Sequence, residues 1–81
     1  MRNELTQKDI ELMRQELEHR RLVLRPQLIE AVKEARAFGD LSENFEYKAA
    51  KKEKNRNDSR CRYLENMIKT AVVISDQSAE G

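Results

Sequence analysis

Apolar residues recur along the first half of the chain at steps of three, four or seven residues. This spacing places them on one face of an α-helix and is typical of a coiled-coil seam. The positions are Ile10, Met13, Leu17, Leu24, Leu28, Val32 and Ala35. Thr6 followed by Asp9 indicates a capped helix start, and Glu16 and Arg20 are spaced for an ion pair on the same helix. We therefore expect a first helix over about residues 7–38.

Two features interrupt this first apolar stripe. Arg20 and Arg21 fall in its gap, where Leu22 and Val23 are out of register. Pro26 lacks a backbone donor, and its ring crowds the carbonyl four residues earlier in an α-helix. Because the apolar phase resumes after Pro26 without a turn-forming sequence, we expect one kinked helix and not two separate ones.

A second apolar stripe predicts a second helix over about residues 43–70. Its positions are Tyr47, Ala50, Cys61, Leu64, Ile68 and Ala71, with Lys54 and Asn57 at the intermediate seam positions. Gly39 follows the end of the first stripe and suits a left-handed helix cap, so residues 39–42 are the expected turn. The predicted fold class is all-α, an antiparallel two-helix coiled-coil hairpin over residues 1–71.

The sequence changes character after Thr70. AVVIS is a β-branched run that predicts a short strand, and a polar tail follows it. No other strand is predicted, so this one has no expected partner. We interpret residues 72–81 as a linker or as the start of a further domain.

Composition narrows the functional classes. A chain of 81 residues forms at most one small domain with a thin core. The charged fraction equals the apolar fraction, 38% each, as expected for long solvated helices. No apolar run is long enough to span a membrane and the N-terminus does not resemble a signal peptide, so a cytoplasmic protein is expected. One cysteine, Cys61, and one histidine, His19, argue against a disulfide or a zinc site.

The net charge of +1 hides an uneven distribution. The predicted turn and its flank carry Asp40, Glu43 and Glu46 without a base, whereas the next part of the second helix is strongly basic. Its bases are Lys48, Lys51, Lys52, Lys54, Arg56, Arg60 and Arg62. This asymmetry is interpreted either as a solvated helix face or as a surface that contacts phosphates, with Lys51 and Lys52 as the first candidates.

Asp40 and Glu43 have two possible roles. Asp-x-x-Glu is a capping box, in which the two acids satisfy free amides at a helix start; spacing alone slightly favours this reading. Ser42 competes as the N-cap residue, which would release both acids to point outward. In the second reading the paired carboxylates are ligands for Mg²⁺, which takes one or two protein carboxylates and leaves its other positions to water or phosphate. The turn itself is expected to be clamped against the stem by Phe38 and Phe45, which flank it.

The stretch EARAFGDLSENFEYKAAK, residues 34–51, resembles the signature of the bacterial transcript cleavage factors GreA and GreB. The flanking stretches RPQLIEAV, RYLENMI and AVVIS fit the same family. The resemblance covers nearly the whole chain and places it on the N-terminal coiled-coil domain of that family. Phe45 is a departure, because the family more often has alanine there. The FKBP-like C-terminal domain of the family would lie beyond Gly81.

The resemblance implies a monomeric factor that is not itself an enzyme and that inserts its hairpin into the secondary channel of RNA polymerase. The acids at the tip of the family hairpin match Asp40 and Glu43. They would help to hold the second Mg²⁺ of the polymerase active site during hydrolysis of backtracked RNA, while the factor binds no metal alone. Ser42 would support them. Contacts with the polymerase or with the RNA 3′ segment would fall on Arg36, Lys48, Lys51 and Lys52.

Two alternatives share the hairpin. One is a regulator that enters the polymerase channel without promoting cleavage. The other is a coiled-coil interaction module in which the seam of the first helix pairs between chains.

Overall fold

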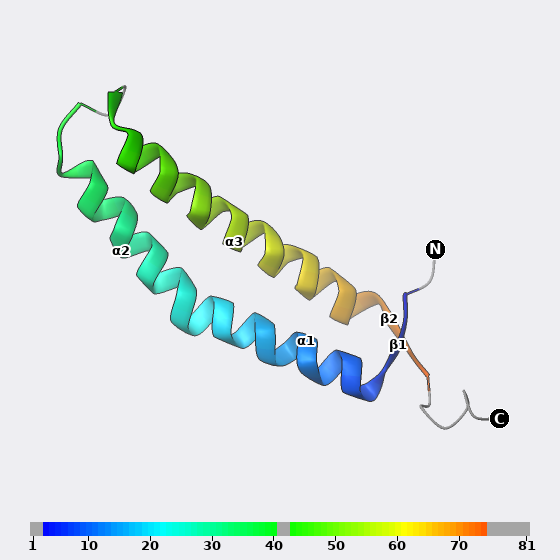
Figure 1. The fold of residues 1–81 in the computed structure, drawn as a ribbon. Coiled ribbons are helices and arrows are strands. Elements are labelled where there is room, and N and C mark those ends of the chain that lie inside the picture. Colours follow the sequence, from blue (N-terminus) through cyan, green and yellow to red (C-terminus); the bar gives the residue numbers. More distant parts are fainter. Residues whose placement is uncertain (1–2, 41–42, 75–81) are drawn as a thin grey trace.

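The structure is a computed structural model that describes residues 3–40 and 43–74. Its elements in chain order are β1 (Asn3–Thr6), α1 (Gln7–His19), the π-helical segment η1 (Arg20–Leu24), α2 (Arg25–Arg36), α3 (Phe45–Thr70) and β2 (Ala71–Ile74). The first three helical segments form one continuous arm, and α3 returns alongside it (Figure 1). The predicted helical hairpin is confirmed. The segment between the two arms is longer than predicted, because α2 ends at Arg36 and α3 begins at Phe45, whereas the expected helices ended near residue 38 and began near residue 43.

The first arm starts with the cap that the sequence predicts. The Thr6 hydroxyl accepts a hydrogen bond from the backbone N–H of Asp9 at 3.1 Å. The Asp9 carboxylate in turn accepts from the backbone N–H of Thr6, also at 3.1 Å. This reciprocal pair satisfies two amides that the helix leaves free, so α1 begins sharply at Gln7.

The expected irregularity before Pro26 takes the form of a π-helical turn. In η1 the backbone N–H of Arg25 donates to the carbonyl of Arg20, five residues earlier. The extra residue in this turn shifts the helix phase, which explains why Leu22 and Val23 are out of register and exposed. The arm bends between α1 and α2 (Figure 1), so the predicted kink is observed with a π-turn as its local cause.

The apolar core is small and lies in the half of the hairpin farther from the turn. Leu17 of α1 packs against Cys61 and Leu64 of α3, with Met13 and Ile68 partly buried beside them. The side chain of Leu64 is fully buried. Because so few side chains exclude water, each of them carries a large share of the stability.

Hydrogen bonds replace apolar contacts in the middle of the seam. The amide of Asn57 is only 4% exposed. It donates to the backbone carbonyl of Arg20 at 3.1 Å and accepts from the Arg20 guanidinium at 2.9 Å. Arg20 also pairs with Glu16 at 2.7 Å, as predicted, and Arg60 reaches the same carboxylate from α3 at 2.8 Å. The gap in the first stripe is thus a polar layer that joins the two arms.

The predicted C-terminal strand is present, but the expectation that it lacks a partner is wrong. β2 pairs in parallel with β1, with Asn3 opposite Ala71 and Thr6 opposite Ile74. The two strands lie together at the base of the hairpin (Figure 1). The division into a hairpin over residues 1–71 and a linker over 72–81 stays a prediction, and residues 75–81 lie outside the described part. Within that part, no helix has the length and apolar character needed to cross a bilayer.

Leu64→Ala is expected to destabilise the hairpin by about 2–5 kcal/mol, because it leaves a cavity in the small core. Thermal and urea unfolding followed by circular dichroism measure this change. Leu12→Ala is the matched control, because Leu12 is exposed on α1 and its loss is expected to cost no more than about 0.5 kcal/mol. Equal effects of the two substitutions would contradict the assigned core.

Hydrogen bonds from Arg60 and Arg20 lower the pKa of Glu16 from 4.5 to about 2. Since the unfolded chain binds this proton more tightly, the stabilisation is fully present above pH 4.5 and is lost as the pH falls toward 2. Glu16→Gln is therefore expected to flatten the dependence of the unfolding free energy on pH in that window, as measured by urea titrations at several pH values. Glu11→Gln, on an exposed face of α1, should leave it unchanged.

Candidate functional site

The candidate site lies at the turn between the two arms, at the end of the hairpin opposite the strands (Figure 1). The chain leaves α2 through tight turns, in which the N–H of Phe38 donates to the carbonyl of Ala35 at 3.1 Å. Gly39 then adopts a φ of +119°, where a side chain would be strained, which confirms its predicted left-handed conformation. Asp40 follows directly and is exposed.

Asn44, which the sequence analysis did not single out, is the residue that caps α3. Its side-chain oxygen accepts from the backbone N–H of Tyr47 at 2.8 Å, so the proposed capping box of Asp40 and Glu43 is wrong for this helix. Ser42 lies outside the described residues. Asp, Ser and Asn are about equally good N-caps, so residue type alone did not choose among them. The useful signal was position, because Asn44 lies three residues before Tyr47, the first position of the second stripe, which is the spacing between an N-cap and the amide that it accepts from.

Asp40 and Glu43 line the same shallow hollow at the tip, and both side chains are exposed. The complete lining is Phe38, Asp40, Glu43, Asn44, Phe45 and Glu46. The carboxylate oxygens of this hollow are of the type that Mg²⁺ prefers. Within residues 3–40 and 43–74, no group of three or more His, Cys, Asp or Glu side chains is arranged to hold a metal ion.

The two phenylalanines beside the tip do not clamp it, contrary to expectation. Phe38 is 70% exposed and Phe45 is 79% exposed. The ammonium group of Lys48 lies 5.6 Å from the centre of the Phe45 ring. Since the side chain of Asn44 makes the connection across the turn, the rings are left on the surface of the tip.

Tyr47 draws basic side chains of both arms together just below the tip. Arg36 of α2 donates to its hydroxyl at 3.4 Å and lies over its ring, 5.4 Å from the centre. Lys51 of α3 approaches the same ring at 5.9 Å. The hydrogen bond from Arg36, with the charge of Lys51, lowers the pKa of Tyr47. The predicted assignment of Tyr47 to the core is only partly met, because the ring is half-buried.

The predicted basic contacts form one surface along α3. A shallow groove there is lined by Tyr47, Lys48, Lys51, Lys52, Asn55, Arg56 and Ser59. These residues repeat at steps of three and four and therefore share a helix face. Lys48, Lys51 and Lys52 are thus brought together as predicted, and Arg36 joins them through Tyr47. Arg56, which the sequence analysis placed in the basic run, extends the surface. Asn55 and Ser59 were not predicted, although helical spacing from Lys52 would have found them.

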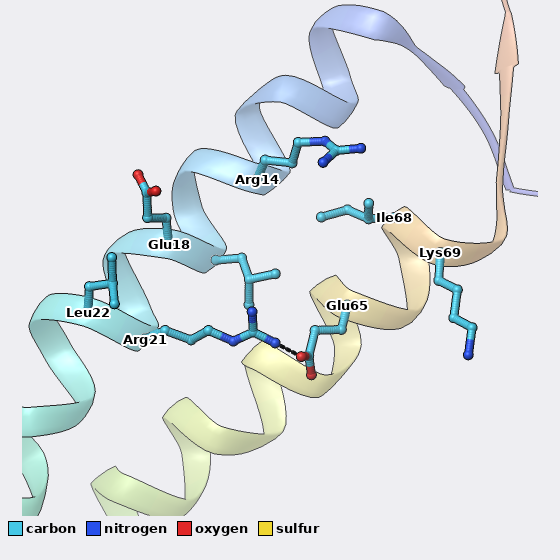
Figure 2. Close-up of a pocket in the computed structure, with 8 residues that line it drawn as sticks. Arg14, Glu18, Arg21, Leu22, Glu65, Ile68 and Lys69 are labelled. Atoms are coloured by element: carbon cyan, nitrogen blue, oxygen red, sulfur yellow. Dashed lines mark ion pairs between the residues drawn. The ribbon is translucent and has the colours of Figure 1, made fainter.

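A second groove lies between α1 and α3, nearer the base (Figure 2). Arg21 extends across it to Glu65, and their ion pair joins η1 to α3. The groove is lined by Arg14, Leu17, Glu18, Arg21, Leu22, Glu65, Ile68 and Lys69. None of these residues was predicted to belong to the site. The groove shares no lining residue with the hollow at the acidic tip.

Comparison with known proteins agrees with this geometry. Residues 3–73 match the family described as "Transcription elongation factor, N-terminal". The chain is 49% identical over 72 residues to transcription elongation factor GreA of Geobacillus kaustophilus, covering 89% of this chain and 46% of that protein. The GreA of Bacillus cytotoxicus is 47% identical over 76 residues, with 94% and 48% covered, and that of Staphylococcus carnosus is 46% identical over 72, with 89% and 45% covered.

The hairpin is therefore the N-terminal domain of the transcription elongation factor class. Within that class the chain belongs to the GreA/GreB family, as the resemblance of its tip sequence indicated. It spans about half the length of the curated relatives that it matches.

Arg36→Gln is expected to raise the pKa of Tyr47 toward its ordinary value of 10, because it removes the principal hydrogen bond to the phenol oxygen. The absorbance of tyrosinate during a pH titration measures this, in a Tyr63→Phe background that leaves Tyr47 as the only tyrosine. Arg62→Gln removes the same charge from an exposed position of α3 and should leave the pKa of Tyr47 as it is in the unsubstituted chain. The same pKa in both variants would rule out the contact.

Proposed function

We propose that this chain is the polymerase-inserting hairpin of a Gre-type transcript cleavage factor. It enters the secondary channel of bacterial RNA polymerase and carries Asp40 and Glu43 to the polymerase active site. There the two carboxylates help to hold the second Mg²⁺, which orients a water for hydrolysis of backtracked RNA. The hairpin is not an enzyme by itself, since the bond is broken in the active site of the polymerase.

The observation that carries this proposal is the shared placement of Asp40 and Glu43 in one exposed hollow at the end of a long hairpin. An exposed tip can reach a buried active site that a compact domain cannot enter. A second metal ion stabilises the attacking and leaving oxygens of a phosphodiester, and carboxylates supplied to a weakly held ion strengthen its binding. The names of the relatives, which are transcription elongation factors, support the same assignment.

The basic surface supplies the other contacts in this proposal. Lys48, Lys51 and Lys52, with Arg36 beside Tyr47, would bind phosphates of the extruded RNA 3′ segment or acidic groups of the channel. Ser42 would support the two acids from between them. The factor would act as a monomer in the cytoplasm, where the polymerase works, because the apolar seam is already used within one hairpin.

One observation favours a second candidate, a channel-binding regulator that does not promote cleavage. Phe45 is almost fully exposed at the tip, where the family more often has alanine. An apolar ring adds contact surface in the channel whether or not the carboxylates hold a metal. The two functions differ in whether cleavage products appear.

Cleavage of RNA in stalled, backtracked polymerase complexes tests the proposal. The factor is this chain, used as it is and also joined to the C-terminal half of the Geobacillus kaustophilus relative. Asp40→Asn and Glu43→Gln keep the size of each side chain and remove its charge, so each is expected to slow cleavage by at least about 10-fold. Mg²⁺ titrations should show that more metal is needed for half-maximal cleavage.

Glu53→Gln is the matched control, because it removes one exposed acid of α3 away from the tip. It should cleave like the unsubstituted factor, and all variants should bind the polymerase equally. Undiminished cleavage by the Asp40 and Glu43 variants would refute the role of the carboxylates. Binding without any cleavage products would instead establish the second candidate.

A further inference from the structure

We propose that Asn44 is a positioning residue that fixes Glu43 relative to Asp40 by linking the two arms across the tip. This inference rests on the proposed function of the two carboxylates. It assigns a role to a side chain that is neither a metal ligand nor a phosphate contact.

The single amide of Asn44 makes two bonds in opposite directions. Its oxygen accepts from the N–H of Tyr47 at 2.8 Å and caps α3. Its nitrogen donates to the backbone carbonyl of Ala35 in α2 at 2.6 Å. Together these bonds tie the start of one arm to the end of the other.

The carbonyl that accepts the bond from Asn44 belongs to a buried residue of α2. Ala35 is buried, 5% exposed, and it is the only buried residue of α2. Its carbonyl lies in the last turn of α2 and already accepts from the N–H of Phe38 at 3.1 Å. The bond from Asn44 is an additional one to this oxygen, and it anchors the tip to a buried residue of α2.

The link acts on the carboxylates through the backbone. Glu43 is bonded directly to Asn44, and Asp40 follows α2 by way of Gly39. Fixing Asn44 against Ala35 therefore limits how far the two acids can move apart. Two ligands of one metal ion need such control, because a displacement of about 1 Å at a reacting centre can cost about 100-fold in rate.

The chemistry of the side chain separates this role from simple capping. Ser and Asp cap a helix about as well as Asn, because a cap requires only an acceptor oxygen. Ionised Asp has no donor, and the hydroxyl of Ser is too short to accept from Tyr47 and reach Ala35 together. Asn44→Ser is therefore expected to keep α3 intact and to lose the link.

The test compares Asn44→Ser with Asn44→Asp and with Cys61→Ala, in the same cleavage assay and against Asp40→Asn. Cys61→Ala is the control for lost stability, because it trims a buried side chain of the apolar core far from the tip. For both Asn44 variants we expect the factor concentration for half-maximal effect to stay unchanged. The maximal cleavage rate should fall about 10-fold or more, and the Mg²⁺ requirement should rise. Cys61→Ala should keep the rate and Mg²⁺ requirement of the unsubstituted factor.

Solution NMR of the chain alone tests the hydrogen bond between Asn44 and Ala35 in the absence of the polymerase. In Asn44→Ser the amide signals of Asp40 and Glu43 should shift, while the N–H of Tyr47 stays protected by the retained cap. The proposal is overturned if both Asn44 variants cleave normally while Asp40→Asn does not. It is also overturned if they lose affinity and rate together, as a general loss of stability would cause. If Asp40→Asn cleaves normally, the proposed function fails, and the NMR result alone decides whether the link exists.

Discussion

The register between the two helical arms depends on the hydrogen bonds of Asn57 with Arg20. A two-helix seam made only of apolar side chains can slip along its length, because one apolar contact resembles the next. A buried amide that finds its partners in a single alignment removes this freedom, since any slip leaves polar groups unsatisfied in the seam. The bond to the Arg20 carbonyl lies inside the π-turn, so the irregularity of one arm and the polar residue of the other belong together. Everything nearer the tip inherits the alignment set there.

The acidic side chains lie at the tip of the hairpin, and the basic side chains lie next to them along α3 in the direction of the base. Tyr47 holds Arg36 and Lys51 at this boundary and keeps them on the ring. Under the proposed function this order matters. Phosphates attracted to the basic groove are brought toward carboxylates that would repel them, unless a divalent cation lies between the two. Under the proposed function, the surface would thus favour nucleic acid and metal together over either one alone.

The sequence predicted the features that depend on local pattern. The capping residues Thr6 and Asp9, the two apolar stripes and Gly39 each carry a local signal, and the hairpin follows from them. Asp40 and Glu43 were placed at the tip for the same reason. The features that were missed depend on partners distant in the chain. The strand partner of β2 is formed by Asn3–Thr6, which shows no strand pattern of its own, and the bond from Asn44 to Ala35 crosses the turn.

The parallel pairing of β1 and β2 has a kinetic consequence. Parallel strands need a long crossover connection, and here the entire helical hairpin is that connection. Joining the strands first would close one very large loop, at an entropic cost that so few strand hydrogen bonds would not offset. We therefore expect the arms to close before the sheet forms, and the small sheet at the base to open first when the hairpin unfolds.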